Sequence, residues 1–351
     1  MTSFLQIIIP LVIVLILTPL VRRLGVYIGA FALENKRTVH HGKIARIGGV
    51  AIYIAFMIGM VIFYHADDTI NGILIGSSIV FFTGLIDDLH DIKPLYKFAG
   101  QSLGALVTIF VGGVCLSKMT LPFDIVISNK VILTIITYFW MVGVTNAINL
   151  IDGLDGLSCG TTTIVLTTMS IIAFGMNRFD VMGIALIMIG ALLGFLRYNF
   201  HPASIFVGDC GALFIGFIVS CISLIGFKST TMIALILPLI ILFVPLADTT
   251  LAIIRRKIAH KSIGEADKGH THHKLMYDMK LGHVKTVLVL YVVTALFGVT
   301  AIVYWQSTLY GSILLIILMI LVEIFVEYTQ MINEKFHPIL SLFKRIKNEK
   351  E

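Results

Sequence analysis

The feature that most constrains this chain is a series of long apolar segments, each close to the roughly 20 residues with which a helix crosses the hydrocarbon core of a membrane. The chain is 58% hydrophobic and only 13% charged over 351 residues, far from the composition of soluble proteins. We therefore predict an all-α polytopic membrane protein with about 11 transmembrane helices. The predicted spans are 3–21, 47–65, 70–87, 100–117, 131–150, 160–176, 181–197, 211–227, 231–251, 286–304 and 309–328.

Basic residues are divided unevenly between the two sides of the predicted membrane. The side reached after the first span carries 22 of the 26 Lys and Arg residues, and the other side carries 4. Because cytoplasmic loops are rich in Lys and Arg, this asymmetry places the N-terminus outside and the C-terminus in the cytoplasm. The first span precedes Arg22 and Arg23 and has no basic residue before it, so we expect a retained span and no cleaved signal peptide. The net charge of +6 follows mostly from this topology and gives little support to nucleic-acid binding.

The chain shows no internal repeat and no low-complexity linker, so we predict one integral membrane domain over residues 1–351. Its four cysteines show no CxxC spacing and lie in or beside predicted spans. We expect packed thiols there, and neither a disulfide set nor a metal site. These residues are Cys115, Cys159, Cys210 and Cys221.

Two adjacent carboxylates, Asp87 and Asp88, stand where the third predicted span ends. A charged side chain at mid-depth in a membrane costs about 2.5 to 3.5 kcal/mol on the lenient insertion scale, so carboxylates at the edge of a span usually have a function or face water. Mg²⁺ binds one or two carboxylates together with substrate phosphate oxygens, and this pair offers such a partial site. Lys97 lies close enough in sequence to neutralise phosphate oxygens. The alternative is a solvated helix end, which is how spans normally stop.

A second polar row follows the fifth predicted span. Asn149, Asp152 and Asp155 are spaced by three residues, so on a helix they would share one face and offer donors and acceptors to a ribose or base. The alternative is turn chemistry, because Asp and Gly are favoured in turns. Asp209 lies between two glycines at the start of a later span, open to a metal or nucleotide or acting as a helix cap. Phe206, just before it, could stack on a base, although a lone Phe beside a span more often faces lipid or packs in the core.

Two further cytoplasmic segments carry candidate ligands for phosphate. Arg46 precedes two glycines in the first loop and would suit a pyrophosphate, although a basic patch at the membrane surface is the simpler interpretation. Asp248 lies near the cytoplasmic end of the ninth predicted span. The loop after it holds His270, His272 and His273, for which phosphate or sugar contacts are favoured over zinc because no Cys accompanies them.

Taken together, these segments resemble the polyprenyl-phosphate N-acetylhexosamine-1-phosphate transferases. Each motif is modest alone, but the ordered set falls on one predicted face and covers most of the chain. The first motif departs slightly from the family pattern, with Thr38 and Ala45 where relatives often carry Lys and Pro. The matching motifs are RxVH…RxGG at 37–49, GLIDDLxD…K…Q at 84–101, NAxNLIDGLDGL at 146–157, RxNxxPAxIFxGDxG at 197–211, PLxDT at 245–249 and HxHHxL at 270–275.

The resemblance implies transfer of a sugar 1-phosphate from a UDP-sugar to undecaprenyl phosphate, with release of UMP. It implies Mg²⁺ as cofactor, with Mn²⁺ as a substitute, and Asp209, Asp87 and Asp88 as catalytic residues and metal ligands. Whether Asp88 acts as a base, or a carboxylate forms a covalent intermediate, stays open. The implied substrate-binding residues are Arg46, Lys97, Asn149, Asp152, Asp155, Arg197, Phe206, Asp248, His270, His272 and His273.

The histidine loop favours one branch of this family. Its HxHH pattern is similar to the N-acetylglucosamine branch, whereas the muramoyl-pentapeptide branch resembles three consecutive His followed by Phe-Glu. We therefore expect a cell-membrane enzyme, its site facing the cytoplasm, that uses UDP-N-acetylglucosamine to start wall teichoic acid or a related glycan. The nearest alternative is phospho-N-acetylmuramoyl-pentapeptide transferase. The oligomeric state stays open, with a homodimer as one alternative. A secondary transporter or lipid flippase is less favoured, because transporters place polar groups near mid-membrane and these acids cluster at one face.

Overall fold

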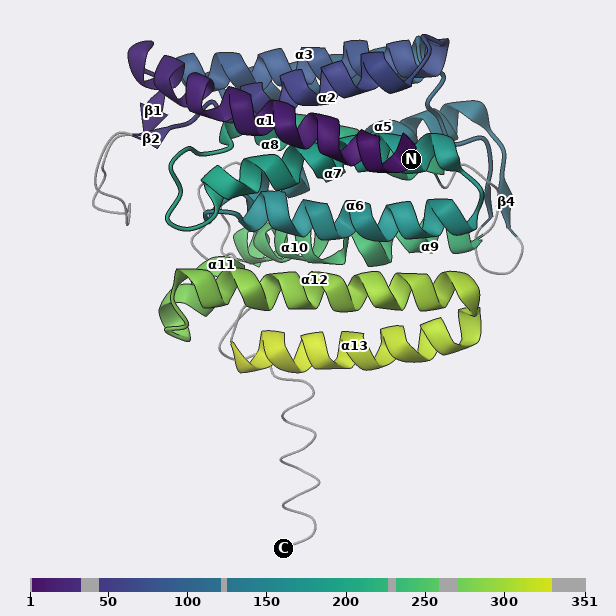
Figure 1. The fold of residues 1–351 in the computed structure, drawn as a ribbon. Helices are drawn as coiled ribbons and strands as arrows, with labels where there is room; N and C mark the ends of the chain where they lie inside the picture. The colour runs from purple at the N-terminus through teal and green to yellow at the C-terminus, as the bar shows by residue number, and fades with distance from the viewer. Residues whose placement is uncertain (1, 33–43, 121–124, 227–231, 259–270, 330–351) are drawn as a thin grey trace, which may run out of the picture.

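A computed structural model describes residues 2–32, 44–120, 125–226, 232–258 and 271–329, and nearly all of them are helical. The long helices run side by side and are stacked from α3 at one edge to α13 at the other (Figure 1). Two-stranded hairpins lie at opposite ends of the stack: β1 (Phe31–Ala32) with β2 (Ile44–Ala45), and β3 (Met119–Thr120) with β4 (Val126–Ile127).

Most helices follow the predicted spans closely, but the fourth begins six residues before, and ends seven residues before, the predicted span 100–117. They are α1 Thr2–Tyr27, α2 Gly49–Phe63, α3 Asp68–His90, α4 Pro94–Phe110, α5 Lys130–Ile151, α6 Leu157–Gly175, α7 Phe179–Asn199, α8 Gly208–Gly226, α9 Met232–Ile241, α10 Phe243–Ile258, α11 Thr271–His273, a π-helical turn Lys274–Asp278, α12 His283–Gln306 and α13 Thr308–Tyr328. The ninth predicted span is two helices, α9 and α10, which meet at Leu242.

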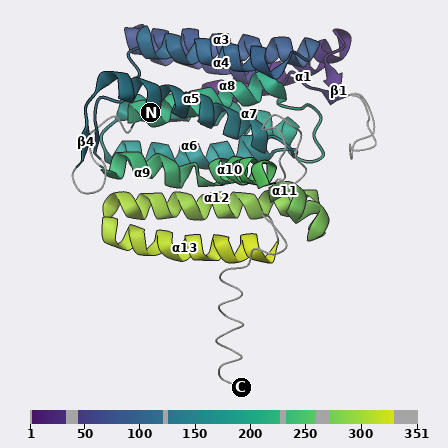
Figure 2. The ribbon, with the colours of Figure 1, turned by 180° about the vertical axis from the view of Figure 1, so that it is seen from behind.

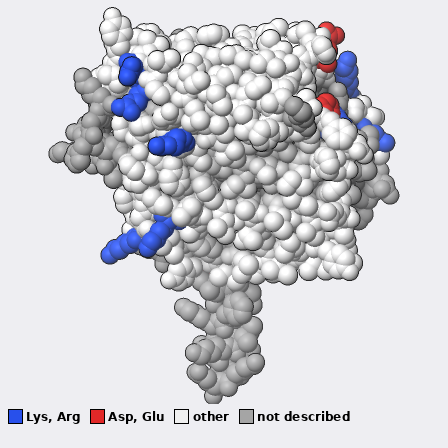
Figure 3. Space-filling model, viewed as in Figure 1, with Lys and Arg blue, Asp and Glu red and all other residues white. Residues whose placement is uncertain are grey.

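Within the described ranges, 8 helices are long and apolar enough to cross a membrane. They are α1, α3, α5, α6, α7, α8, α12 and α13. Helices α2 and α4 are shorter, with 15 and 17 residues. On the face shown in Figure 3, charged side chains gather at the two ends and leave an uncharged belt between them. The prediction of an all-α, multi-pass membrane protein is confirmed, whereas the count of about 11 spans stays a prediction.

Helix α8 forms the centre of the bundle. Every residue from Cys210 to Gly226 is buried, and the helix contacts α2, α3, α5, α6 and α7. Such burial on all sides requires a helix that is apolar all round, and this sequence is. Two of the cysteines, Cys210 and Cys221, are buried in this helix as packed thiols. The first turn of α8 therefore lies in the middle of one end of the stack, and its residue Asp209 with it.

Helix α3 is pressed against that first turn through Gly84. A Cβ atom added to Gly84 would lie 2.6 Å from the Asp209 carbonyl oxygen and 2.6 Å from the Cys210 Cα. Helix backbones come this close only where a side chain is missing. The glycine thus sets the distance between the acidic end of α3 and the start of α8.

Gly84→Ala is therefore expected to destabilise the protein by about 1–3 kcal/mol, the usual cost of forcing an extra carbon into a packed interior. The measurement is thermal unfolding of the purified protein in detergent. Gly143→Ala in α5 is the matched control, because nothing lies within 4 Å of the added Cβ there. The control should unfold at or above the wild-type temperature, since Ala favours helix. Equal stability of the two variants would contradict the packing argument.

A short backbone ladder joins the first hairpin to the segment that precedes α8. Phe206 N donates to Ala45 O at 2.9 Å, Gly48 N donates to Phe206 O at 3.0 Å, and Gly49 N donates to Val207 O at 2.8 Å. Arg46 lies inside this ladder. Its side chain is consequently held beside the N-terminus of α8.

Candidate active site

Carboxylates from two helices meet one lysine at the end of the stack that carries β1 and β2. Lys97, on the first turn of α4, places its Nζ 2.8 Å from Asp87 Oδ2 on α3 and 3.0 Å from Asp209 Oδ1 on α8. About a fifth of the Lys97 and Asp209 side chains is exposed, at 22% and 21%. The cluster is therefore mostly buried, yet part of it is open to a ligand at this end of the stack.

Two more side chains orient the Asp209 carboxylate. Asn149, in the last turn of α5, donates from Nδ2 to Asp209 Oδ1 at 2.7 Å. Arg46 lies on the opposite side, with a guanidinium nitrogen 3.8 Å from Asp209 Oδ2. Each Asp209 oxygen thus faces a donor, and α4, α5 and the segment after β2 all converge on this residue.

Asp88 is used differently from its neighbour Asp87. Its Oδ1 accepts a hydrogen bond from Asp209 N at 2.9 Å, and its Oδ2 accepts one from Cys210 N at 2.9 Å. The side chain is 0% exposed, and Arg46 Nε lies 3.4 Å away. The first amides of a helix lack partners within the helix and carry partial positive charge, so a carboxylate there caps the helix. Asp88 therefore holds the helix end on which Asp209 stands.

The cluster has the donor set that a hard divalent cation needs. Mg²⁺ prefers one or two carboxylates together with phosphate oxygens and water. Asp87 and Asp209 already converge on a single cationic atom, the ammonium nitrogen of Lys97, at 2.8 and 3.0 Å. These two residues fit Mg²⁺, whereas both oxygens of Asp88 are occupied by backbone amides.

The predicted polar row after α5 does not share one helix face, because α5 ends at Ile151. Asp152 lies in the following turn and accepts a hydrogen bond from Ser158 Oγ at 2.5 Å. Burial raises the pKa of Asp152 to about 7. The negative charges of Asp209 and Asp88 also raise this pKa, and the hydrogen bond from Ser158 lowers it. The charge of the Asp152 carboxyl group is therefore coupled to the acidic cluster. Its hydrogen-bond partner is Ser158, whereas Asn149 bonds Asp209.

Asp155 is buried between three segments of the chain. Its Oδ2 accepts from Ala203 N at 3.1 Å and lies 2.8 Å from His201 Nδ1, while the His201 and His283 rings stack at 4.1 Å. Potential ligand atoms of Asp155, His201 and His283 lie within 4.8 Å of one another, a combination of residue types that also occurs in metal sites. The bonds of Asp155 to the 201–203 segment instead indicate a tether between the loop after α5 and the loop after α7.

Asp248 anchors the histidine segment. This carboxylate is 3% exposed, and its Oδ1 accepts from Thr271 N at 2.7 Å and from Thr271 Oγ at 2.6 Å. The next residue, His272, is buried and packs against Gly153 in the loop after α5. His273 stacks on Tyr277 at 5.8 Å. Asp248 thus brings His272 to the Asp152 loop, and His270 lies outside the described residues.

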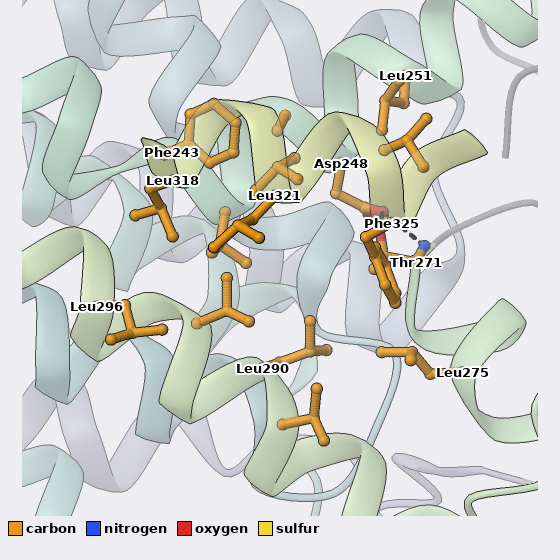
Figure 4. Close-up of a pocket in the computed structure, with 16 residues that line it drawn as sticks. Phe243, Asp248, Leu251, Thr271, Leu275, Leu290, Leu296, Leu318, Leu321 and Phe325 are labelled. Atoms are coloured by element: carbon orange, nitrogen blue, oxygen red, sulfur yellow. Dashed lines mark hydrogen bonds between the residues drawn. The ribbon is translucent and has the colours of Figure 1, made fainter. Parts of the chain in front are cut away.

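An apolar cavity begins at this anchor. It has a volume of about 250 Å³ and lies between α10, α12 and α13. Figure 4 shows the bond between Asp248 and Thr271 at one end and aliphatic or aromatic side chains, such as Leu290, Leu318 and Phe325, along the walls. The anchor therefore marks a boundary between the polar loops and the apolar interior.

Asp248→Ala should release the histidine segment and lower kcat/KM by about 10- to 100-fold, because two hydrogen bonds to one buried oxygen are lost. Asp248→Asn is the matched control: its amide oxygen can still accept both bonds from Thr271, so activity within a few-fold of wild type is expected. Steady-state kinetics of the two variants make the comparison. Equal losses in both would show that the charge of Asp248, and not its anchoring, is needed.

Arg197 is exposed on the last turn of α7, and Phe206 is half-buried in the backbone ladder. Their roles in substrate binding stay predictions. Asn199, which sequence reasoning did not single out, is 2% exposed and links two loops: its Oδ1 accepts from Gly156 N and its Nδ2 donates to Ile205 O. The signal for Asn199 was its place inside the 197–211 motif.

Comparison with known proteins agrees with this arrangement of motifs. Residues 70–227 match the sequence model of the family described as Glycosyl transferase family 4. A Bacillus subtilis (strain 168) protein, named a probable undecaprenyl-phosphate N-acetylglucosaminyl 1-phosphate transferase, is 39% identical over 346 residues, covering 97% of this chain and 95% of the relative. The chain belongs to glycosyl transferase family 4.

Two other relatives share a smaller part of their length with this chain. A decaprenyl-phosphate N-acetylglucosaminephosphotransferase of Mycolicibacterium smegmatis is 31% identical, covering 77% of this chain and 74% of the relative. A phospho-N-acetylmuramoyl-pentapeptide-transferase of Streptococcus uberis is 34% identical, covering 50% of this chain and 56% of the relative. The region that matches the family includes Asp87, Lys97, Asn149 and Asp209. The resemblance read from the motifs is confirmed.

Proposed function

We propose that this protein transfers N-acetylglucosamine 1-phosphate from UDP-N-acetylglucosamine to undecaprenyl phosphate and releases UMP. The observation that carries the proposal is the match, over almost the whole chain, to a relative named for this donor sugar and this lipid. The relatives named for the muramoyl-pentapeptide reaction align with a smaller share of the chain, 50% for two of them and 65% for a third. Asp87, Asp209 and Lys97 meet at one end of a bundle of apolar helices, and together they offer carboxylates for a metal and a positive charge for phosphate.

The reaction replaces one phosphoanhydride bond with another. An oxygen of the lipid phosphate forms a bond to the β-phosphorus of the UDP-sugar, the bond from that phosphorus to the bridging oxygen of UMP breaks, and UMP leaves with the electron pair. Both reactants are anionic, so catalysis consists mainly of positioning and charge neutralisation. The product is a lipid diphosphate that carries N-acetylglucosamine.

The side chains of the site divide this work among themselves. Lys97 and Arg46 supply positive charge to phosphate oxygens, and Asn149 holds Asp209 in orientation through its 2.7 Å hydrogen bond. Asp209 and Asp87 would hold Mg²⁺, with Mn²⁺ as a substitute, and that ion would neutralise charge on the phosphoryl groups. Asp88 keeps the first turn of α8 in place, and the Asp152 and Asp155 loop together with His272 and His273 serves the nucleotide and sugar.

We further propose that the whole chain is a single transferase domain of about 11 spans in the cell membrane, with the N-terminus outside and the site in the cytoplasm. The bias of Lys and Arg, 22 to 4, supports this orientation. A cytoplasmic site agrees with the location of nucleotide sugars. The lipid-linked product would serve wall teichoic acid or a related surface glycan.

The deciding experiment incubates the purified protein in detergent with undecaprenyl phosphate, MgCl₂ and UDP-N-acetylglucosamine, and follows UMP. Release that requires both the lipid and the metal is the expected result. Omitting the lipid controls for simple hydrolysis of the donor, and adding EDTA tests the metal. UMP only with UDP-N-acetylmuramoyl-pentapeptide would move the protein to that branch, and no UMP with either donor would overturn the proposal.

A further inference from the structure

Helices α4 and α5, which lie side by side in Figure 2, are joined by two amide side chains that the reaction itself does not use. Asn146 Nδ2 donates to Gln101 Oε1 at 2.6 Å, and Gln101 Nε2 faces Asn146 Oδ1 at 3.4 Å. Asn146 also donates to the carbonyl oxygen of Val142 at 2.8 Å. Gln101 is only 2% exposed, and both polar atoms of its side chain face Asn146.

The positions of these amides relate them to the site. Gln101 lies four residues after Lys97 on α4, and Asn146 lies three residues before Asn149 on α5. Residues three or four apart on a helix lie above one another on the same face. The amide pair is therefore one helical turn behind the pair formed by Lys97 and Asn149.

The side chains of Lys97 and Asn149 contact the same atom, Asp209 Oδ1. Lys97 Nζ is 3.0 Å and Asn149 Nδ2 is 2.7 Å from Asp209 Oδ1. Both donors reach this oxygen only if α4 and α5 keep one relative height and rotation. A sliding of either helix by a fraction of a turn would separate them.

We propose that Gln101 and Asn146 form a positioning clamp that sets Lys97 and Asn149 on the Asp209 carboxylate. Both are positioning residues: Gln101 acts through Lys97 on the same helix, and Asn146 acts through Asn149. The inference rests on the proposed function for its kinetic consequence. Its structural consequence, the orientation of Asp209, is independent of the substrate.

A second bridge between the same helices provides a matched control. Ser102 Oγ and Tyr138 Oη lie 2.7 Å apart and also join α4 to α5. Tyr138 is eleven residues before Asn149, about three turns away from the site. Tyr138→Phe removes this bridge without touching the clamp.

The test compares Gln101→Leu, Asn146→Leu, the exchanged pair Gln101→Asn with Asn146→Gln, and Tyr138→Phe. Each leucine variant should lower kcat for UMP release by about 10- to 100-fold, because small misplacements of catalytic groups are costly, while KM for UDP-N-acetylglucosamine changes by less than about 3-fold. The exchanged pair, which can still form an amide–amide bond, should recover at least part of that loss. The control should stay within about 2-fold of wild type.

Mn²⁺ binding, measured by electron paramagnetic resonance, gives a readout without turnover. The leucine variants should bind Mn²⁺ about 10-fold more weakly than wild type, the lower end of the usual loss when an outer-shell partner of a metal ligand is removed, and Tyr138→Phe should not. Losses in Tyr138→Phe equal to those in the clamp variants, or an exchanged pair no better than the single variants, would overturn the clamp. Should wild type release no UMP with any donor, the proposed function fails, and the Mn²⁺ series still decides the clamp.

Discussion

Asp209→Asn is expected to reduce UMP release by about 1,000-fold or more, the scale of losing a preorganised charge at a phosphoryl-transfer site. The change removes one negative charge from the atom pair that Lys97, Asn149 and Arg46 surround. It keeps the size of the side chain, and Asp88 still caps α8 through backbone amides. The fold should therefore be retained. The measurements are UMP release and thermal unfolding in the same detergent.

Asp91→Asn provides the matched control for charge. Asp91 lies just past the end of α3, its side chain is 86% exposed, and its Oδ1 is 3.5 Å from Arg46. Exposed ion pairs contribute little, so this variant should keep activity within about 3-fold of wild type. Near-normal turnover in Asp209→Asn, or equal losses in the two variants, would remove Asp209 from the centre of the site.

Lys97→Met should lower turnover by about 100- to 1,000-fold, because the phosphates lose a positive charge that is held between two carboxylates. The same change leaves Asp87 and Asp209 without that ammonium group, so the apo site becomes more anionic. Mn²⁺ should consequently bind at least as tightly as to wild type while the reaction slows. Loss of both turnover and Mn²⁺ binding would instead indicate a collapsed site.

Lys97→Arg and Lys93→Met complete this series. A guanidinium is planar and spreads its charge, so it is a poor replacement for a lysine that bonds two carboxylates. The activity of Lys97→Arg should lie between the activity of wild type and that of Lys97→Met. Lys93 is exposed at the start of α4, four residues before Lys97. Its replacement controls for the loss of positive charge near the site and should have little effect. An Lys93→Met loss as large as that of Lys97→Met would show that general surface charge is responsible.

The membrane architecture could be predicted because helices that cross a membrane must be long and apolar, and this signal is local. The break between α9 and α10 was not predicted: both halves are apolar, and hydropathy does not report a turn at Leu242. The end of α5 at Ile151 agrees with the predicted end of the fifth span at residue 150. Residue spacing alone could not decide whether Asp152 and Asp155 continue the helix or lie in a turn, and the structure shows a turn that includes Gly156 with φ at +77°.

The residues of the site could be predicted as a group, but not how each is used. Asp87 and Asp88 are neighbours in sequence with the same chemistry, yet one faces Lys97 and the other faces the amides of α8. That difference depends on a contact 121 residues away along the chain, which no local pattern contains. Asp248 was expected at the substrate, and its bonds to Thr271 became visible only in the folded chain.

The attachment of the histidine segment through Asp248 and Thr271 has a consequence for how enzymes of this kind come to use different UDP-sugars. The acidic cluster stands on helices that touch backbone to backbone at Gly84, so that part of the protein tolerates little variation. The histidines instead lie on a short segment, Thr271–Asp278, in which Thr271 donates two hydrogen bonds to Asp248 of α10. New side chains at exposed positions of that segment, such as Tyr277, should disturb the helices less than a change at Gly84. We therefore expect differences in sugar selectivity among such enzymes to arise from changes in this segment.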